Sequence, residues 1–361
     1  MRISDYIPPI SRPLEDPHER QDAGAPAQVP SEDQLAPSMT YALDRSLKAM
    51  NRLLENLIRC QPNSAKVVNE LLLGGSAHGA IAEFVEQVEI KRMRSQQWAS
   101  EVRNLKSAMT DVIGRLTEQQ CQQVPHVQDR ILRELSSEPV PAEIAEAFDA
   151  VINSPNNFFD KLLELIDLIK NGYLAGYEHL IKAYSEFFSD FNSYISAQLH
   201  HWIKGGGDGK EVEVNAGAIR LALEALMAKY TLPNPAAVLF PAPGMDKASK
   251  EEADNWRKAL GLPESCLVDN GDGTFCVVMD LSPLKTMHAS LPPDEDWIKW
   301  DTAKFQAWQT GFNAQEERMK NMLQSFTQKY SNANSYHDNF NKTLSSHLNQ
   351  FADMLKAMLN F

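Results

Sequence analysis

The sequence TAKFQAWQTGFNAQEERMKNMLQSFTQKYSNANSYHDNFNKTLSSHLNQFADMLKAMLNF, residues 302–361, decides the fold of this chain. From Phe305 to Met358, mostly apolar and aromatic residues recur at every third or fourth position, which is the period of one helix face and not of a strand. The run holds no proline and a single glycine, Gly311, so it predicts one unbroken helix of roughly 85 Å. A helix of that length needs an equally long partner, because a narrow apolar stripe is not stable alone in water.

A second stripe, which begins near residue 154, supplies that partner. Its positions also step by three and four, apart from doubled steps of four around Tyr173 and Tyr177. An extra step of four residues is a stutter, which locally unwinds a left-handed supercoil. The C-terminal run has similar irregularities. We therefore predict an antiparallel coiled coil of residues 154–204 with residues 302–361. The predicted seam contains Phe159, Ile166, Tyr173, Tyr177, Tyr184, Phe191, Trp308, Phe312, Met319, Phe326, Phe340 and Leu344.

The segment before the coiled coil divides into a disordered start, a hairpin and a linker. Residues 1–37 hold many Pro, Ala and acidic residues and few aliphatic ones, so they cannot offset chain entropy by burial and are predicted to be disordered. Residues 38–122 carry helical stripes with short connections, which predict a helical hairpin. Residues 123–153 hold Pro125 and Pro139-Val140-Pro141 and predict a linker with one short helix. The hairpin is either a small bundle of no special role, which the residues alone favour, or a detachable cover for another apolar surface.

Residues 205–301, between the two long helices, have a different pattern. A glycine-rich run ends the first helix, and Asp269-Asn270-Gly271-Asp272-Gly273 predicts a hairpin turn between two apolar runs. Strands are predicted near 211–214, 238–240, 266–268 and 275–279, and helices near 216–230 and 250–260. The chain is therefore expected to be mainly α with a small α/β insertion, built on a long antiparallel intramolecular coiled coil plus an N-terminal helical hairpin.

Composition and charge exclude several classes of function. The formal net charge of −13 argues against general nucleic-acid binding and against attraction to anionic membranes. No apolar run approaches the roughly 18 residues that span a bilayer. The start, Met1-Arg2-Ile3-Ser4-Asp5, lacks a signal-peptide pattern, so we expect no signal-peptide secretion, while export by another route stays open. The four cysteines are too scattered for a disulfide framework; Cys266 and Cys276 would meet only in one strand register, and free buried thiols are expected.

No motif predicts catalysis, a metal or a cofactor. Residues 204–211 contain Gly209-Lys210 but lack the first Gly and the Ser or Thr of a phosphate-binding loop. Residues 269–273 lack the alternating acidic ligands of a calcium loop. The nine histidines show no ligand spacing, and His337 is interpreted as a hydrogen-bonded or edge-exposed residue rather than a pH sensor. We expect the chain not to be an enzyme and to bind no cofactor.

Several motifs resemble one known family, the type III secretion needle-tip proteins of the IpaD, SipD and BipD group. In the C-terminal run these motifs are Asp301-Thr302-Ala303-Lys304-Phe305-Gln306-Ala307-Trp308-Gln309-Thr310-Gly311-Phe312, Thr327-Gln328-Lys329-Tyr330-Ser331-Asn332-Ala333-Asn334-Ser335, Asp338-Asn339, Lys342 and Leu344-Ser345-Ser346. In the insertion, the motifs that resemble SipD in particular are Val238-Leu239-Phe240-Pro241-Ala242, Leu262-Pro263 with Ser265-Cys266-Leu267, and Asp280-Leu281-Ser282-Pro283-Leu284. The resemblance covers about residues 160–361, and before Asn153 only the layout is similar.

The resemblance implies a function that residue spacing cannot show. Members of the family pass unfolded through the secretion needle and assemble as a small ring, about a pentamer, at its tip. There they regulate secretion, sense host signals and form the platform on which hydrophobic translocator proteins enter the host membrane. This implies a protein that is cytoplasmic before export and then lies at the bacterial surface on the needle tip. In the family the N-terminal hairpin packs on the coiled coil as an intramolecular chaperone, which is the cover interpretation of residues 38–122.

The resemblance also implies partners and binding residues. In the family the distal part of the C-terminal helix contacts the needle subunit, which assigns that contact here to Asp338, Asn339, Lys342, Ser345 and Ser346. The solvated face of a coiled coil is the competing interpretation of each. Enteric members of the family bind bile salts between hairpin and coiled coil, so bile salts are a candidate ligand.

Two other functional classes compete with the needle-tip interpretation. An exported effector, enzymatic or not, would use the coiled coil as a dimerisation arm, and the lack of a catalytic constellation disfavours it without excluding it. A membrane-inserting translocator would need a long apolar segment, which the sequence lacks.

Overall fold

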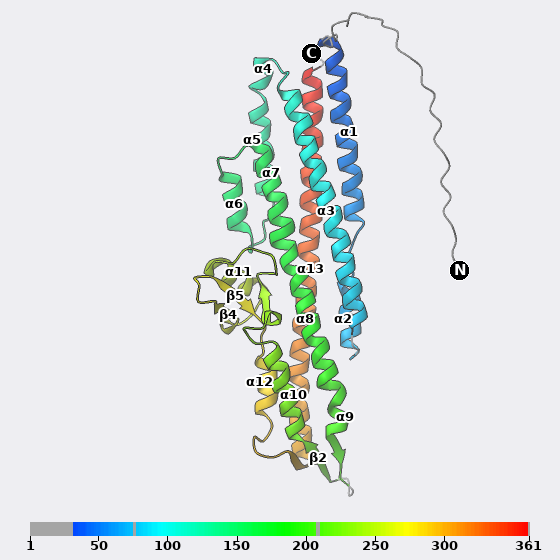
Figure 1. The fold of residues 1–361 in the computed structure, drawn as a ribbon, viewed down its shortest axis with the longest axis vertical. Coiled ribbons are helices and arrows are strands. Elements are labelled where there is room, and N and C mark those ends of the chain that lie inside the picture. The colour runs from blue at the N-terminus through cyan, green and yellow to red at the C-terminus, as the bar shows by residue number, and fades with distance from the viewer. Residues whose placement is uncertain (1–31, 75–76, 207–209, 360–361) are drawn as a thin grey trace, which may run out of the picture.

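The computed structural model describes residues 32–74, 77–206 and 210–359, and shows an elongated molecule built along one long helix (Figure 1). That helix, α13 (Thr302–Leu359), runs for 58 residues without a break. Beside it lies a second rod, made of α7 (Phe158–Asp167), the π-helix η1 (Leu168–Leu174) and α8 (Ala175–Tyr194). The predicted fold class, mainly α with a small α/β insertion, is confirmed.

Aromatic side chains join the two rods in antiparallel order. Tyr184 lies against Phe326 with ring centroids 5.0 Å apart, and Phe159 lies against Phe351 at 6.3 Å. Residue numbers therefore rise along one rod as they fall along the other. Each such ring pair contributes about 0.5–1.5 kcal/mol beyond the burial of its surface. Every residue of the predicted seam is buried.

The irregular spacing around Tyr173 and Tyr177 coincides with the π-helix η1. A π-helical turn holds more residues than an α-helical turn, so it absorbs the extra position in the sequence pattern. Tyr173 contacts Tyr336 of α13, whereas the ring of Tyr177 lies 4.9 Å from that of Trp256 in the insertion. Gly176 permits this close approach, because a Cβ at that position would lie 2.6 Å from the Trp256 ring.

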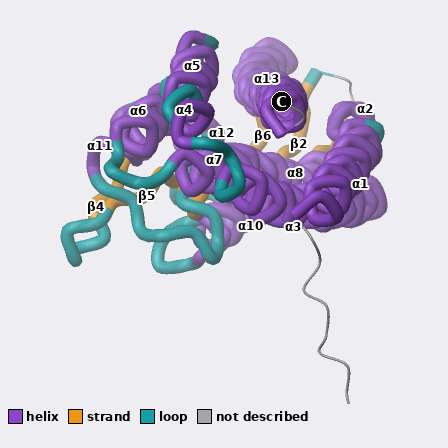
Figure 2. Tube along the Cα trace, turned by 90° about the horizontal axis from the view of Figure 1, so that it is seen from above, coloured by secondary structure: helices purple, strands orange, loops and turns teal. Residues whose placement is uncertain are grey.

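The N-terminal helices lie along the half of α13 that ends at the C-terminus (Figure 1, Figure 2). They are α1 (Glu32–Ile58), the short α2 (Ser64–Leu72) and α3 (His78–Ile113). The sequence predicts disorder up to residue 37, whereas α1 begins at Glu32. The rest of the predicted disordered start, residues 1–31, lies outside the described residues.

The segment that follows the hairpin is more ordered than a linker with one short helix. Residues 123–153 form α5 (Val124–Ser137) and α6 (Ala145–Asn153), and the one-turn α4 (Glu118–Cys121) precedes them at the end of the segment predicted as the hairpin. Pro125 does not break α5, since it occupies the first turn, where no backbone hydrogen bond is lost. Phe148 of α6 is fully buried, and its ring lies 6.4 Å from that of Phe340 on α13. The prolines therefore separate helices here without preventing them from packing on the rod.

The insertion contains two three-stranded antiparallel sheets. One has the order β1-β2-β6, with β1 (Ile203–Gly205), β2 (Glu211–Asn215) and β6 (Trp297–Asp301). The helices that continue the α7–η1–α8 rod therefore end at Trp202, with the one-turn α9 (Leu199–Trp202). The other has the order β3-β5-β4, with β3 (Val238–Phe240), β4 (Leu267–Asp269) and β5 (Phe275–Val278). The helices of the insertion are α10 (Ala216–Lys229), α11 (Lys250–Leu260) and α12 (Ser282–Ala289). Cys276 pairs with Val268 across β4 and β5, so it does not face Cys266, and all four cysteines are free.

The contact of Gly176 with Trp256 leads to a stability prediction. A valine at position 176 would collide with a buried indole, so Gly176→Val should lower the free energy of unfolding by about 1–3 kcal/mol in urea titrations. Gly311→Ala is the matched control in α13: nothing lies within 4 Å of its added methyl, and it should raise stability by up to about 1 kcal/mol. Equal effects of the two substitutions would contradict the assigned packing.

Candidate assembly surface and ligand groove

The residues predicted to contact the needle subunit fall into two sets on the C-terminal half of α13. Asn339, Lys342 and Ser346 are exposed and share one helix face at a spacing of three and four. Asp338 and Ser345 are buried, with 5% and 2% of their surfaces exposed. Only the first set is available to a partner while the hairpin lies on α13.

A buried ion pair connects Asp338 with the hairpin. Lys91 Nζ, on α3, donates to both carboxylate oxygens of Asp338 at 2.9 and 3.0 Å, and the lysine is only 1% exposed. Gln61 Nε2, in the α1–α2 connection, donates to the same carboxylate at 2.8 Å and its carbonyl accepts from Asn334 Nδ2 at 2.5 Å. The carboxylate is therefore held by groups from two parts of the hairpin.

His337 completes this cluster in its neutral form. Its Nδ1 lies 3.2 Å from Asp338 and its Nε2 lies 3.1 Å from Asn341 Nδ2, which is a donor, so the tautomer with the proton on Nδ1 satisfies both contacts. Ser95 Oγ of α3 lies 3.3 Å from the same Nε2. Burial lowers the pKa of His337, and the nearby charge of Lys91 lowers it further against the effect of Asp338. Burial alone would raise the pKa of Asp338, but the hydrogen bond from His337 and the charge of Lys91 hold it below its ordinary value.

The chemistry of this cluster allows the hairpin to separate from α13. A buried ion pair stabilises docking weakly, because desolvation of both charges offsets their attraction, and both charges regain water when the surfaces part. The buried Oδ1 of Asn334 and the hydroxyl of Tyr330 have no hydrogen-bond partner among the described residues, which also disfavours the closed state. Tyr330 still packs against Phe84 of α3, with ring centroids 5.4 Å apart. Further polar contacts of the hairpin with the rods join Asn51 with Asn349, Asp44 with Lys356, and Asn192 with the carbonyl of Leu71.

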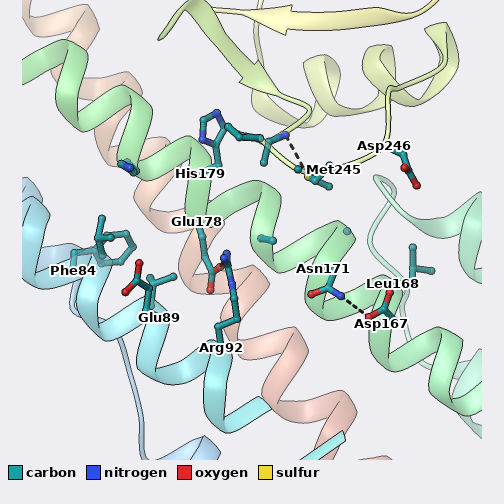
Figure 3. Close-up of a pocket in the computed structure, with 18 of the residues that line it drawn as sticks. Phe84, Glu89, Arg92, Asp167, Leu168, Asn171, Glu178, His179, Met245 and Asp246 are labelled. Atoms are coloured by element: carbon teal, nitrogen blue, oxygen red, sulfur yellow. Dashed lines mark hydrogen bonds and ion pairs between the residues drawn. The ribbon is translucent and has the colours of Figure 1, made fainter. Parts of the chain in front are cut away.

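A groove of about 680 Å³ lies between α3, the η1–α8 rod and the 242–246 loop of the insertion (Figure 3). Phe84 and Val88 give it an apolar wall, and Arg92 of α3 points toward Glu178 of α8, at 2.9 Å. Glu178 is 6% exposed, and burial raises its pKa to about 7, although Arg92 opposes the shift. His179 Nε2 donates to the backbone carbonyl oxygen of Val238 in the insertion, 2.9 Å away, and burial lowers the pKa of His179.

Neither a metal centre nor a membrane span is found in the part of the chain that the structure describes. Within residues 32–74, 77–206 and 210–359, no three His, Cys, Asp or Glu side chains are placed to hold one metal ion. No helix in the same ranges is both long and apolar enough to cross a bilayer.

Sequence reasoning missed the role of Lys91, although the sequence holds a signal for it. Lys91 stands in the buried stripe of α3, between Val88 and Ser95, where an apolar residue is the ordinary choice. A lysine at such a position needs a buried anion, and Asp338 in the stripe of α13 is the corresponding acid. No pattern within either helix indicates that these two residues meet.

Comparison with known proteins identifies the family. The type III secretion systems tip complex components match residues 51–359 of this chain. The chain belongs to that family. Cell invasion protein SipD of Salmonella typhi is 38% identical over 211 residues, which cover 57% of this chain and 62% of SipD. Invasin IpaD of Shigella flexneri is 36% identical over 230 residues, which cover 63% of this chain and 66% of IpaD.

The resemblance to needle-tip proteins is thereby confirmed, while each of these matches spans less than two thirds of the relative's own length. A solved structure, the pathogenicity island 1 effector protein from Chromobacterium violaceum, is similar along nearly its whole length. It has a TM-score of 0.56 and 26% identity, and the match covers 88% of this tip complex component and 97% of that protein.

Removal of Lys91 tests the buried ion pair. Lys91→Met leaves the Asp338 carboxylate buried without its cation, so the free energy of unfolding should fall by about 3–5 kcal/mol in urea titrations. Lys91→Met/Asp338→Leu should lose clearly less than the single variant, because no unpaired charge remains. Lys66→Met, which removes the exposed pair with Glu83, should change the free energy of unfolding far less than Lys91→Met, because water screens exposed ion pairs.

His337 gives the stability of this tip protein a specific pH dependence. Because its folded pKa is lowered, the unfolded chain takes up a proton below about pH 6.5 that the folded chain does not, so the stabilisation is present above that pH and is lost as pH falls toward the folded pKa. His337→Gln should flatten the fall of the unfolding free energy between pH 7 and 5.5, by up to about 1.4 kcal/mol per pH unit. His179 is unchanged in both proteins and cancels in the difference; parallel curves would rule out this role of His337.

Proposed function

We propose that this protein caps the type III secretion needle, regulates secretion, senses host signals and serves as the platform on which hydrophobic translocator proteins enter the host membrane. Membership of the tip complex family supports this function. The observation that supports it is the α13 surface around Asp338, which the hairpin covers with a buried ion pair as well as with apolar contacts such as that of Phe84 with Tyr330. In this proposal the protein acts by binding and not by catalysis. It is cytoplasmic before export and then resides at the needle tip.

In this proposal the parts of the chain have separate tasks. Residues 1–37 serve export, and residues 38–122 form the detachable cover. Residues 154–204 and 302–361 form the central rod, whose Asn339, Lys342 and Ser346 meet the needle subunit first and whose Asp338 and Ser345 follow when the cover leaves. Residues 205–301 form the α/β domain, and copies of the chain assemble into a ring of about five.

The groove beside the hairpin is the proposed place for bile salts. A bile salt has an apolar steroid body, which Phe84 with Val88 would complement, and an anionic end, which would compete with Glu178 for the cation Arg92. Because the groove is bounded by α3 and by the rod, a ligand there would bias the hairpin between its docked and displaced positions.

Location on the bacterium tests the proposed function. Immunogold electron microscopy of intact, secretion-competent bacteria, with antibody against residues 205–300, should place gold at needle tips. Gold absent from needles, with the protein free in the medium or inside host cells, would favour an exported effector instead.

Cross-linking of the closed state tests the cover. Asn51 of α1 and Asn349 of α13 exchange hydrogen bonds at 3.0 Å, so cysteines at these two positions can be joined by a short bis-maleimide in a background with Cys60 and Cys121 changed to Ser. The linked protein should bind isolated needles at least about tenfold more weakly than the unlinked one, because the surface around Asp338 stays covered. Each single-cysteine variant, treated with the same reagent, is the control and should bind as the untreated protein does. Undiminished binding of the linked protein would show that the hairpin need not move.

A further inference from the structure

The outer face of α1 carries a row of cations without counter-ions. Arg45, Lys48 and Arg52 follow one another at a spacing of three and four, all are exposed, and none forms an ion pair with any described acidic residue. Like charges at these spacings destabilise a helix. In a chain with a net charge of −13, such a row costs stability and brings no compensating contact within the subunit.

This row lines a groove between α1 and α3 that faces away from α13. The groove has a volume of about 760 Å³, and Tyr41, 72% exposed, stands at its end. Across from the row lie Glu101 and Asn104 of α3, so the lining keeps an excess of positive charge. The opposite, apolar face of α1 packs inward, so the groove stays accessible whether the hairpin is docked or displaced.

A complementary surface lies on the other side of the same molecule. Glu138, Glu146, Asp149, Asp246 and Glu252 are all exposed, and none of them forms an ion pair with a described cation. They belong to α6, α11 and the adjoining connections, which lie across the rods from α1 (Figure 1, Figure 2). Burial raises the pKa of Glu252, and the charges of Asp246 and Glu146 raise it further, so these three carboxylates lie close enough to act on one another. We call this surface the acidic face and the α1 row with its groove the basic groove.

We propose that the basic groove of one copy binds the acidic face of a second copy, so that copies of this chain associate head to tail. The inference rests on the proposed tip function and names the contact between neighbouring subunits of the assembly. The basic groove holds three cations against one acid, and the acidic face holds five carboxylates beside Lys247 and Lys250, so the excess charge on each surface opposes its pairing with itself in a symmetric dimer. A contact between two different surfaces repeats from copy to copy and closes into a ring when the rotation allows it. Guanidinium groups such as those of Arg45 and Arg52 pair with carboxylates through two parallel hydrogen bonds, which fixes orientation as well as charge.

Charge reversal on each surface tests the contact. The basic-groove variant is Arg45→Glu/Lys48→Glu/Arg52→Glu, and the acidic-face variant is Glu146→Lys/Asp149→Lys/Asp246→Lys; a third chain carries all six changes. Sedimentation velocity of the full chain at low ionic strength should show self-association of the wild type that weakens in high salt. Each single-surface variant should associate about tenfold or more weakly, and the six-fold variant should recover the wild-type association. Thermal unfolding by circular dichroism checks that all variants fold, since every changed side chain is exposed.

The acidic-face variant separates the proposed contact from an effect of net charge. That variant carries less net negative charge than the wild type, so general repulsion predicts stronger association, whereas the proposed contact predicts weaker association. An equimolar mixture of the two single-surface variants should associate again, because the acidic-face variant keeps the basic groove and the basic-groove variant keeps the acidic face.

Three outcomes would overturn the proposal: a wild type that remains monomeric at low salt, single-surface variants that associate like it, or a six-fold variant that does not recover. Failure of the tip function would appear separately, as wild-type protein missing from needles whatever its association in solution.

Discussion

The antiparallel contact between the α7–η1–α8 rod and α13 is the interaction on which the other packing in the molecule depends. Both rods are too narrow to be stable alone, and aromatic pairs such as Tyr184 with Phe326 close the seam between them. The hairpin packs against both rods at one end, and the insertion packs against α8 through Trp256 and Tyr177. A change in the alignment of the rods would therefore move both attached parts, because each takes its position from side chains on the seam.

The two long contacts of α13 differ in chemistry. Its contact with α8 is aromatic and mainly apolar, with a hydrogen bond from the Tyr184 hydroxyl to the Met319 carbonyl, so separation would expose a large hydrophobic surface. Its contact with the hairpin includes a buried ion pair, a neutral histidine and paired amides, all of which gain hydration on separation. The first contact suits a permanent scaffold, and the second suits a surface that must open and close. Within one helix, Phe326 thus belongs to a contact that stays closed and Asp338 to a contact that can open.

The sequence predicts the long elements well because each depends on a local period. The stripe from Phe305 to Met358 is sufficient for α13, and the doubled step at Tyr173 and Tyr177 marks the place of the π-helix. The turn around Gly271 predicts β4 and β5 because a left-handed glycine there is a local requirement. Periodicity fails where prolines suggest a linker, since a proline in the first turn of α5 is compatible with a helix.

The site was less predictable than the fold because it depends on pairs that are far apart in sequence. Motif resemblance selected Asp338 but could not show that the hairpin buries it, since Lys91 lies 247 positions earlier. Burial of Ser345 beside exposed Ser346 likewise follows from which neighbour covers each side of α13, and no local pattern contains that information. Surfaces such as the basic groove and the acidic face are harder still to predict from the sequence, because nothing in a helical period distinguishes an unpaired charge from a paired one.

The hydrogen bonds between Asn51 and Asn349 join residues 298 positions apart and so set an order of events in folding. A ribosome completes α1 and α3 long before it makes the end of α13, and contacts of such wide separation form slowly. The apolar stripes of the hairpin helices therefore stay partly exposed until the last part of the chain leaves the ribosome. During this interval, a process that requires an unfolded chain can bind the protein. The interval ends when the C-terminal turns of α13 reach α1.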